Sequence, residues 1–243
     1  PLSCAYCLGA TDTPTTPEAD LMTVKLTFLG HSACLIESGD HAVAIAPFLT
    51  GNPVASCAAD DLNPTHIALT HGHDDHLGDT VPLAKRTGAT VYAAFEICNF
   101  LGEQGLENLE PGNPGGKIST DFGFIAFTQA FHSSSSGGRY LGMPCGVIVN
   151  IGGHTIYHAG DTALFGDMKL IGELYTPDVA LLPVGDRFTM GPDHARHAAE
   201  MIKPKIAIPI HHSTWPLLTS DLGEFKPAGV EVCALEPAAS IEL

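Results

Sequence analysis

The stretch LTHGHDDHLGDT, residues 69–80, decides the fold of this chain and directs its chemistry. It continues the apolar run THIALT and holds His71, His73, Asp75 and His76 within six positions. Alternate side chains of an extended segment point the same way, so His71 and His73 can grip one metal ion. A turn into a helix then directs Asp75 and His76 toward a second ion. A solvated polar loop is the alternative, but imidazoles packed this densely repel one another on protonation unless a cation keeps them neutral.

Three further metal-capable side chains also follow apolar runs directly. His132 follows FTQAF, Asp161 follows TIYHAG, and His211 follows IAIPI. Because α/β sheets place their ligands at the carboxyl ends of strands, we expect these endings to converge with the 71–76 segment in one crevice. The sequence therefore predicts a site of seven side chains drawn from distant parts of the chain.

The runs around these residues predict an α/β architecture. Helical periodicity predicts helices over 77–88, 163–175 and 192–202, the last with Pro192 in its first turn and Pro204 just beyond its end. Strand clusters with helices interspersed favour α/β layering over a β-sandwich alone. Short apolar or β-branched runs bounded by Gly, Pro or Asp predict strands at 24–30, 41–49, 65–70, 89–94, 122–131, 146–152, 154–160, 178–184 and 205–210.

Composition predicts one folded domain over residues 22–243, preceded by an N-terminal extension over 1–21. The extension ends in the Pro/Thr-rich TDTPTTPEAD, which has little periodic apolar pattern. Hydrophobic residues at 44% and charged residues at 16% exclude a disordered chain. The net charge of −16 counts against nucleic acid as a partner. No apolar run is long enough to span a membrane and no signal peptide is evident, so we expect a cytoplasmic protein without a membrane partner.

The seven cysteines do not indicate a disulfide framework. Their number is odd and they are scattered through apolar surroundings, which is typical of reduced, buried thiols. Cys4 and Cys7 form a single CxxC without a second pair, which favours an incidental pair over a zinc ribbon or redox motif.

The same residues carry a family resemblance. The motifs GHSACLIE, PFLTGNP, LTHGHDDHLGDT, YHAGDTALFGDMKLIGELY and GDRFTMGP occur in order between about Met22 and the C-terminus. They resemble the metallo-β-lactamase superfamily and, more narrowly, its UPF0173 branch of metal-dependent hydrolases, related to the UlaG-like ascorbate-6-phosphate lactonases. The resemblance implies a four-layer αββα sandwich with the metals at one edge of the sheets.

The resemblance also implies a ligand set for two divalent ions. Asp161 would bridge the two ions, because a carboxylate has two oxygens and can span cations about 3.5 to 4 Å apart. Oxygen and nitrogen ligands suit Zn²⁺ and also Mn²⁺ or Fe²⁺. The first metal would be held by His71, His73 and His132, and the second by Asp75, His76 and His211.

The function that the resemblance implies is hydrolysis of a small-molecule substrate at an ester, lactone or related bond. Two cations lower the pKa of a bound water toward about 7, so that a metal-bridging hydroxide attacks the substrate, with Asp75 as a candidate general base. Phosphodiester cleavage is an alternative of the same fold. A non-catalytic metal-binding protein is another, because Ala46 stands where the family's IDPF stretch has an Asp that orients ligands, and losing such a group costs about 10- to 100-fold in metal affinity or activity.

Four further features have two interpretations each. His31 is a candidate catalytic residue that contacts substrate, or a structural histidine. His212, where relatives often have Tyr, either donates a proton or hydrogen bond to substrate or faces the opposite side of its strand. Arg187 either anchors an anionic substrate or pairs with an acid such as Asp186. The SSSSGG run at 133–138 is a mobile lid or a linker. The sequence is compatible with a homo-oligomer.

Overall fold

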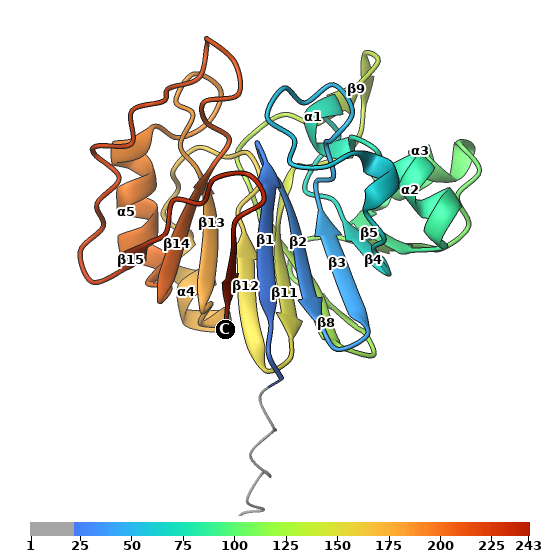
Figure 1. Ribbon diagram of the computed structural model, residues 1–243, viewed down its shortest axis with the longest axis horizontal. Helices are drawn as coiled ribbons and strands as arrows, with labels where there is room; N and C mark the ends of the chain where they lie inside the picture. The colour runs from blue at the N-terminus through green and yellow to red at the C-terminus, as the bar shows by residue number, and fades with distance from the viewer. Residues whose placement is uncertain (1–21) are drawn as a thin grey trace, which may run out of the picture.

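The computed structural model describes residues 22–243, and its elements form four layers (Figure 1). Two mixed sheets face each other in the middle, and helices cover the outer face of each sheet. The αββα sandwich expected from the resemblance is therefore confirmed. The predicted extension over 1–21, with Cys4 and Cys7, lies outside the described residues.

The first sheet is antiparallel from β16 to β3 and parallel from β3 to β6. Its parallel half contains β4, the strand that leads into the histidine-rich segment. The strand order is β16-β1-β2-β3-β4-β5-β6, with bounds Ser240–Glu242, Lys25–Gly30, Ala33–Ser38, His41–Ile45, His66–Ala68, Thr90–Ala94 and Leu109–Gly112.

The second sheet repeats this plan. It is antiparallel from β7 to β12 and parallel from β12 to β15. The strand order is β15-β14-β13-β12-β11-β8-β7, with bounds Glu231–Val232, Ile206–Ile210, Val179–Pro183, His154–His158, Cys145–Ile151, Gly123–Gln129 and Lys117–Ser119.

Three hydrophobic cores lie between the layers. Successive side chains of a strand point to opposite faces of its sheet and therefore pack in different cores. Along β11, Val147 and Val149 pack in the core between the two sheets, whereas Ile148 points to the outer helices. Strand β13 alternates in the same way, with Leu181 inside and Leu182 outside. These strands are buried on both faces, which explains why they appear in the sequence as continuous apolar runs.

The helices confirm some predicted boundaries and correct others. Helix α5 (Pro192–Ile202) has the predicted bounds, and α4 (Met168–Tyr175) begins five residues later than predicted. The helix predicted over 77–88 is α2 (Thr80–Thr87), which begins three residues later, and a separate short helix, α1 (Asp74–Leu77), precedes it. They are separated at Gly78, where φ is 43° and an added Cβ would lie 2.3 Å from the Pro47 carbonyl oxygen. Helix α3 (Phe95–Glu103) and the short 3-10 helix Ala59–Asp61 were not predicted.

The SSSSGG segment forms a hairpin, not an open loop. Strands β9 (Ser135–Ser136) and β10 (Arg139–Tyr140) pair across the two intervening glycines, both of which have positive φ. The Ser136 hydroxyl donates to Asp74 Oδ1 at 2.7 Å, and Arg139 forms a double contact with Glu103 on α3. The hairpin is thus attached to both α1 and α3.

Within residues 22–243, no helix is both long enough and apolar enough to cross a membrane.

Candidate metal centre

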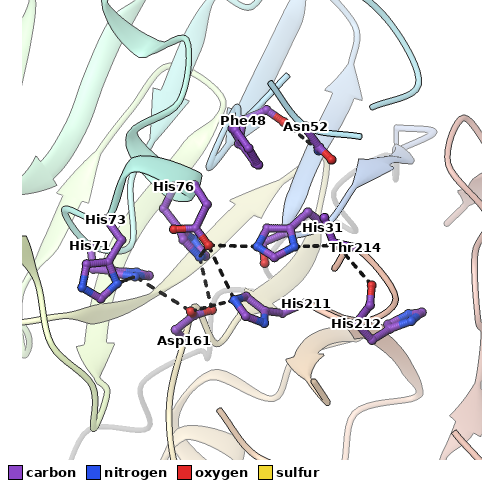
Figure 2. Close-up of polar contacts among 12 residues, drawn as sticks. His31, Phe48, Asn52, His71, His73, His76, Asp161, His211, His212 and Thr214 are labelled. Carbon is purple, nitrogen blue, oxygen red and sulfur yellow. Dashed lines mark hydrogen bonds and ion pairs between the residues drawn. The ribbon is translucent and has the colours of Figure 1, made fainter. Parts of the chain in front are cut away.

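The seven predicted side chains lie together at one end of the sandwich. Figure 2 shows His71, His73, His76, Asp161 and His211 among them. His71 and His73 follow β4, and Asp75 and His76 belong to α1. The remaining three follow strands of the second sheet, where β8, β12 and β14 end. The two sheets therefore contribute their strand ends to a single cluster, as the sequence pattern predicts.

Asp161 lies at the centre of the cluster and is 2% exposed. Its Oδ2 is 3.0 Å from His211 Nε2, and its Oδ1 is 3.2 Å from His76 Nε2. The same Oδ2 lies 3.6 Å from His132 Nε2 and 4.0 Å from His71 Nε2. Each carboxylate oxygen thus faces a different set of imidazoles, which is the arrangement that a bridging ligand requires.

The ligand atoms form two groups around Asp161. In the first group, the facing nitrogens of His71, His73 and His132 lie within 4.8 Å of one another, and His71 Nε2 is 3.0 Å from His73 Nδ1. In the second group, Asp75 and His211 face each other at 3.7 Å. His76 and His31 complete the second group within the same 4.8 Å limit.

Divalent cations fit this cluster because buried polar atoms in it lack partners. Among the described residues, His76 Nε2 and Asp161 Oδ1 are buried and face each other at 3.2 Å without hydrogen-bond geometry. Such groups cost free energy unless something satisfies them. Donor atoms about 2.0 to 2.2 Å from a tetrahedral cation lie about 3.3 to 3.6 Å apart, a range that the 3.0 to 4.0 Å distances around Asp161 bracket.

Thr70 holds two of the histidines from behind and was not predicted. Its hydroxyl oxygen lies 3.1 Å from His71 Nδ1 and 3.2 Å from His76 Nδ1. A metal-ligating histidine is usually oriented by a contact of this kind at its other ring nitrogen, which leaves Nε2 free to face the metal. The sequence signal was weak, because a threonine at a strand end has many uses.

His31 is buried behind Asp75, so the prediction that it contacts substrate is corrected. The His31 side chain is fully shielded from solvent, with Nδ1 2.8 Å from Thr214 Oγ1 and Nε2 3.0 Å from Asp75 Oδ2. Burial lowers the pKa of His31 to about 4. His31 therefore positions Asp75, and its Nε2 is also close enough to Asp75, His76 and His211 to belong to their ligand group.

His212 points away from the cluster, so the prediction that it is catalytic is also corrected (Figure 2). Its Nδ1 lies 2.9 Å from Ser213 Oγ, and the residue does not line the cleft in front of the cluster. Strand β14 ends at Ile210 and His211 has φ of 56°, so the chain turns here, and His211 faces the cluster while His212 does not.

Charges within the cluster favour cation binding. Burial alone would raise the pKa of Asp161, but His76 and His211 outweigh it and hold the pKa well below its usual range. Burial opposes protonation of His211, yet Asp161 and Asp75 raise the pKa of His211 to about 10. Burial lowers the pKa of His71 well below its usual value. The two carboxylates thus attract a cation, and a cation that binds at His211 would displace the proton that Asp161 and Asp75 favour there.

A cleft of about 470 Å³ opens onto this cluster. Asp75 is 23% exposed at its floor, and Phe48, Phe188 and Trp215 are its aromatic lining residues. Arg187 is exposed and does not line the cleft; its guanidinium carbon lies 6.0 Å from the Phe188 ring centroid. This position does not favour Arg187 as an anion anchor inside the cleft.

Known proteins resemble this chain in both sequence and fold. The family model described as "Beta-lactamase superfamily domain" matches residues 25–211. A "UPF0173 metal-dependent hydrolase" of Carboxydothermus hydrogenoformans is 44% identical over 227 residues, covering 90% of this chain and 100% of that protein. A protein of the same name from Desulforamulus reducens is 50% identical over 212 residues, covering 84% of this chain and 91% of its own. A solved metallo hydrolase of the archaeon Ignicoccus hospitalis has a TM-score of 0.83 and 36% identity, covering 91% of this chain and 98% of its own.

Proposed function

The chain belongs to the β-lactamase superfamily and, within it, to the UPF0173 family, and from this membership we propose that it is a metal-dependent hydrolase that cleaves a small ester, lactone or related bond. The observation that carries the proposal is the placement of Asp161, whose Oδ2 lies 3.0 Å from His211 of the second ligand group and 3.6 Å from His132 of the first. This placement suits a dinuclear site.

Two divalent cations, with zinc as the first candidate, would be held by the two ligand groups. Asp161 would belong to both groups. When bound, such a pair supplies Lewis acidity that lowers the pKa of water toward about 7 and polarises a carbonyl. The first group is His71, His73 and His132, and the second is Asp75, His76 and His211.

Asp75 is the candidate general base. Both carboxylates of the cluster line the cleft, and Asp75 is the more accessible of the two, being 23% exposed where Asp161 is 2% exposed. Burial raises its pKa, but the neighbouring His211, 3.7 Å away, and the hydrogen bond with His31 at 3.0 Å outweigh burial and hold the pKa of Asp75 far below its usual range. A carboxylate with so low a pKa is a weak base by itself, so the proposed role depends on cations that would lower the pKa of the water, while His31 fixes the position of the Asp75 carboxylate.

Metal analysis followed by a substrate panel tests the proposal. The purified chain is expected to contain about two divalent ions per molecule and to hydrolyse 4-nitrophenyl esters or lactones faster than bis(4-nitrophenyl) phosphate. Asp75→Ala should lower kcat by at least about 100-fold while the circular dichroism spectrum is unchanged. Asp193→Ala is the matched control, because Asp193 lies on α5 with its side chain 54% exposed.

Three outcomes would overturn parts of this proposal. An unchanged kcat in Asp75→Ala would remove Asp75 as the base. Preference for the phosphodiester would favour the phosphodiesterase alternative. Metal binding without turnover, with turnover gained in Ala46→Asp, would show that this chain is a metal-binding protein whose catalysis is lost at position 46.

A further inference from the structure

We propose that the cleft selects an uncharged substrate whose apolar arms extend on both sides of the scissile bond, a substrate class that rests on the proposed hydrolase function. The metal-facing floor of the cleft is polar, but the linings on either side of it include exposed aromatic side chains and no lysine or arginine. Such walls provide binding energy for apolar groups and none for a phosphate or carboxylate tail.

The first wall is a single aromatic surface. The Phe48 and Trp215 rings lie 6.2 Å apart, and both pack against His31, at 6.0 and 4.7 Å between ring centroids. Phe48 therefore sits beside the cluster in a fixed position (Figure 2). Phe188 lines the same cleft and is 53% exposed, so it has a free face that a ligand can cover.

The second wall lies beyond His132 and Ser133, which line both the first cleft and a neighbouring hollow of about 540 Å³. This hollow runs beside the hairpin, with Phe131, Tyr140 and Met143 among its lining residues. These three side chains are 54%, 68% and 50% exposed, although large apolar side chains are usually buried. A substrate held at the metal cluster can therefore extend one apolar arm toward Phe188 and the other toward Phe131.

Charge excludes anionic arms from both hollows. Among residues 22–243, those lining the two hollows include no lysine or arginine, and the first hollow contains the exposed carboxylate of Asp74. The chain as a whole carries a net charge of −16. A carboxylate or phosphate at the end of a substrate arm would lose hydration against aromatic rings and find no lysine or arginine in either lining, because Arg187, whose guanidinium carbon lies 6.0 Å from the Phe188 ring centroid, is not a lining residue.

A matched ester series tests the inference. With zinc-loaded protein, kcat/KM should rise about two- to fourfold per methylene from 4-nitrophenyl acetate to butyrate to hexanoate. Mono-4-nitrophenyl succinate, which has a carboxylate near the position of the terminal methyl of the butyrate, should react at least about tenfold more slowly than the butyrate. Phe188→Ala should flatten the chain-length gain, and Phe188→Lys should raise the rate with the succinate. Leu174→Ala, with Leu174 73% exposed and on α4, is the control that keeps the gain.

Binding without turnover supplies a second readout, because Trp215 is the single tryptophan of the chain and lines the cleft. N-pentylacetamide should change the tryptophan fluorescence of zinc-loaded protein at concentrations where 5-acetamidopentanoate, its carboxylate counterpart, does not. The same titration of Phe188→Ala should require a higher amide concentration.

The outcomes separate this inference from the proposed function. Hydrolysis of the succinate as fast as the butyrate, or a chain-length gain that survives in Phe188→Ala, overturns the inference and leaves the hydrolase intact. Absence of all hydrolysis with fluorescence changes from the amide alone overturns the proposed function and supports the uncharged, apolar selectivity of the cleft. Absence of hydrolysis with equal responses to both amides overturns both proposals.

Discussion

The two sides of the cleft are built on different principles. On the metal-facing side, Asp161 is buried and Thr70 and His31 hold the neighbouring side chains by hydrogen bonds from behind. On the opposite side, Phe188 is half exposed and follows strand β13 on a loop. The comparison teaches that the reaction chemistry is fixed by strand ends and buried contacts, whereas selectivity resides in side chains that can change without disturbing the core.

The largest loss of metal and of activity is expected when the central carboxylate of Asp161 is removed. Asp161→Asn removes the negative charge that faces His76 and His211 and weakens any ligand shared between two cations. We expect metal stoichiometry to fall below two and kcat/KM to fall by more than about 100-fold. Inductively coupled plasma mass spectrometry and initial rates measure both quantities. Asp167→Asn, an exposed position six residues further along the chain, is the control.

A full metal complement in Asp161→Asn would contradict the central role given to this carboxylate. Equal losses in Asp161→Asn and Asp167→Asn would point to a general effect on folding.

Removing a contact behind the ligands should have an intermediate effect. His31 has φ of 59°, a conformation that Asn tolerates, so His31→Asn removes the contact with Asp75 with little backbone strain. We expect metal affinity or kcat to fall by about 10- to 100-fold. Thr214→Val should give part of this loss because Thr214 supports His31 at 2.8 Å, and Thr214→Ser should restore it.

If Thr214→Ser behaved as Thr214→Val does, the hydroxyl would not be the feature that matters. A His31→Asn variant with unaltered metal affinity and kcat would show that His31 does not position Asp75.

The sequence predicts the convergence of the metal ligands but not the orientations of the side chains around them. The strand-end pattern predicts the convergence of His71, His132 and His211, because a buried strand fixes where its last residue lies. It does not separate His31 from the cleft or turn His212 away, because those orientations depend on Thr214 and Ser213, which carry no distinctive pattern.

The bounds of one strand and one helix were predicted wrongly for a similar reason. The strand predicted over 41–49 ends at Ile45, since Ala46 has φ of 46°, and the helix predicted from 163 begins at Met168. Before that helix, Thr162 Oγ1 accepts the Phe131 backbone N–H. Tertiary contacts override local propensity at both positions.

The free energy of unfolding of the chelated protein should pass through a maximum as pH is varied. Bound metal should remove the decrease on the alkaline side of that maximum. His211 has a folded pKa of about 10, above its unfolded value near 6.5, so its contribution is complete below about pH 6.5 and is lost as pH rises through 10. One such group lowers the free energy of unfolding by at most about 1.4 kcal/mol per pH unit. Toward acid, burial lowers the pKa of His31 and His158 to about 4, so stability falls from pH 6.5 to 4.

Urea unfolding at pH 5, 7 and 9, with and without zinc, measures this profile. Zinc should replace the proton on His211 and flatten the change between pH 7 and 9. A chelated protein that is more stable at pH 9 than at pH 7 would contradict the charge state assigned to His211.

The smallest effect is expected at Ala46, which stands where the family's IDPF stretch has an Asp. Ala46 is fully buried in the core between the sheets and has a left-handed backbone, which costs a non-glycine residue about 1 to 2 kcal/mol. Ala46→Gly relieves this strain but loses a buried methyl worth about 0.8 kcal/mol and gains unfolded-chain entropy of about 0.5 to 1 kcal/mol. The free energy of unfolding should therefore change by less than about 1 kcal/mol in urea, with metal content unchanged. A loss of metal in Ala46→Gly would mean that the Ala46 methyl packs against the cluster closely enough to hold its ligands. Support of the metal ligands would then include a residue of the core between the sheets.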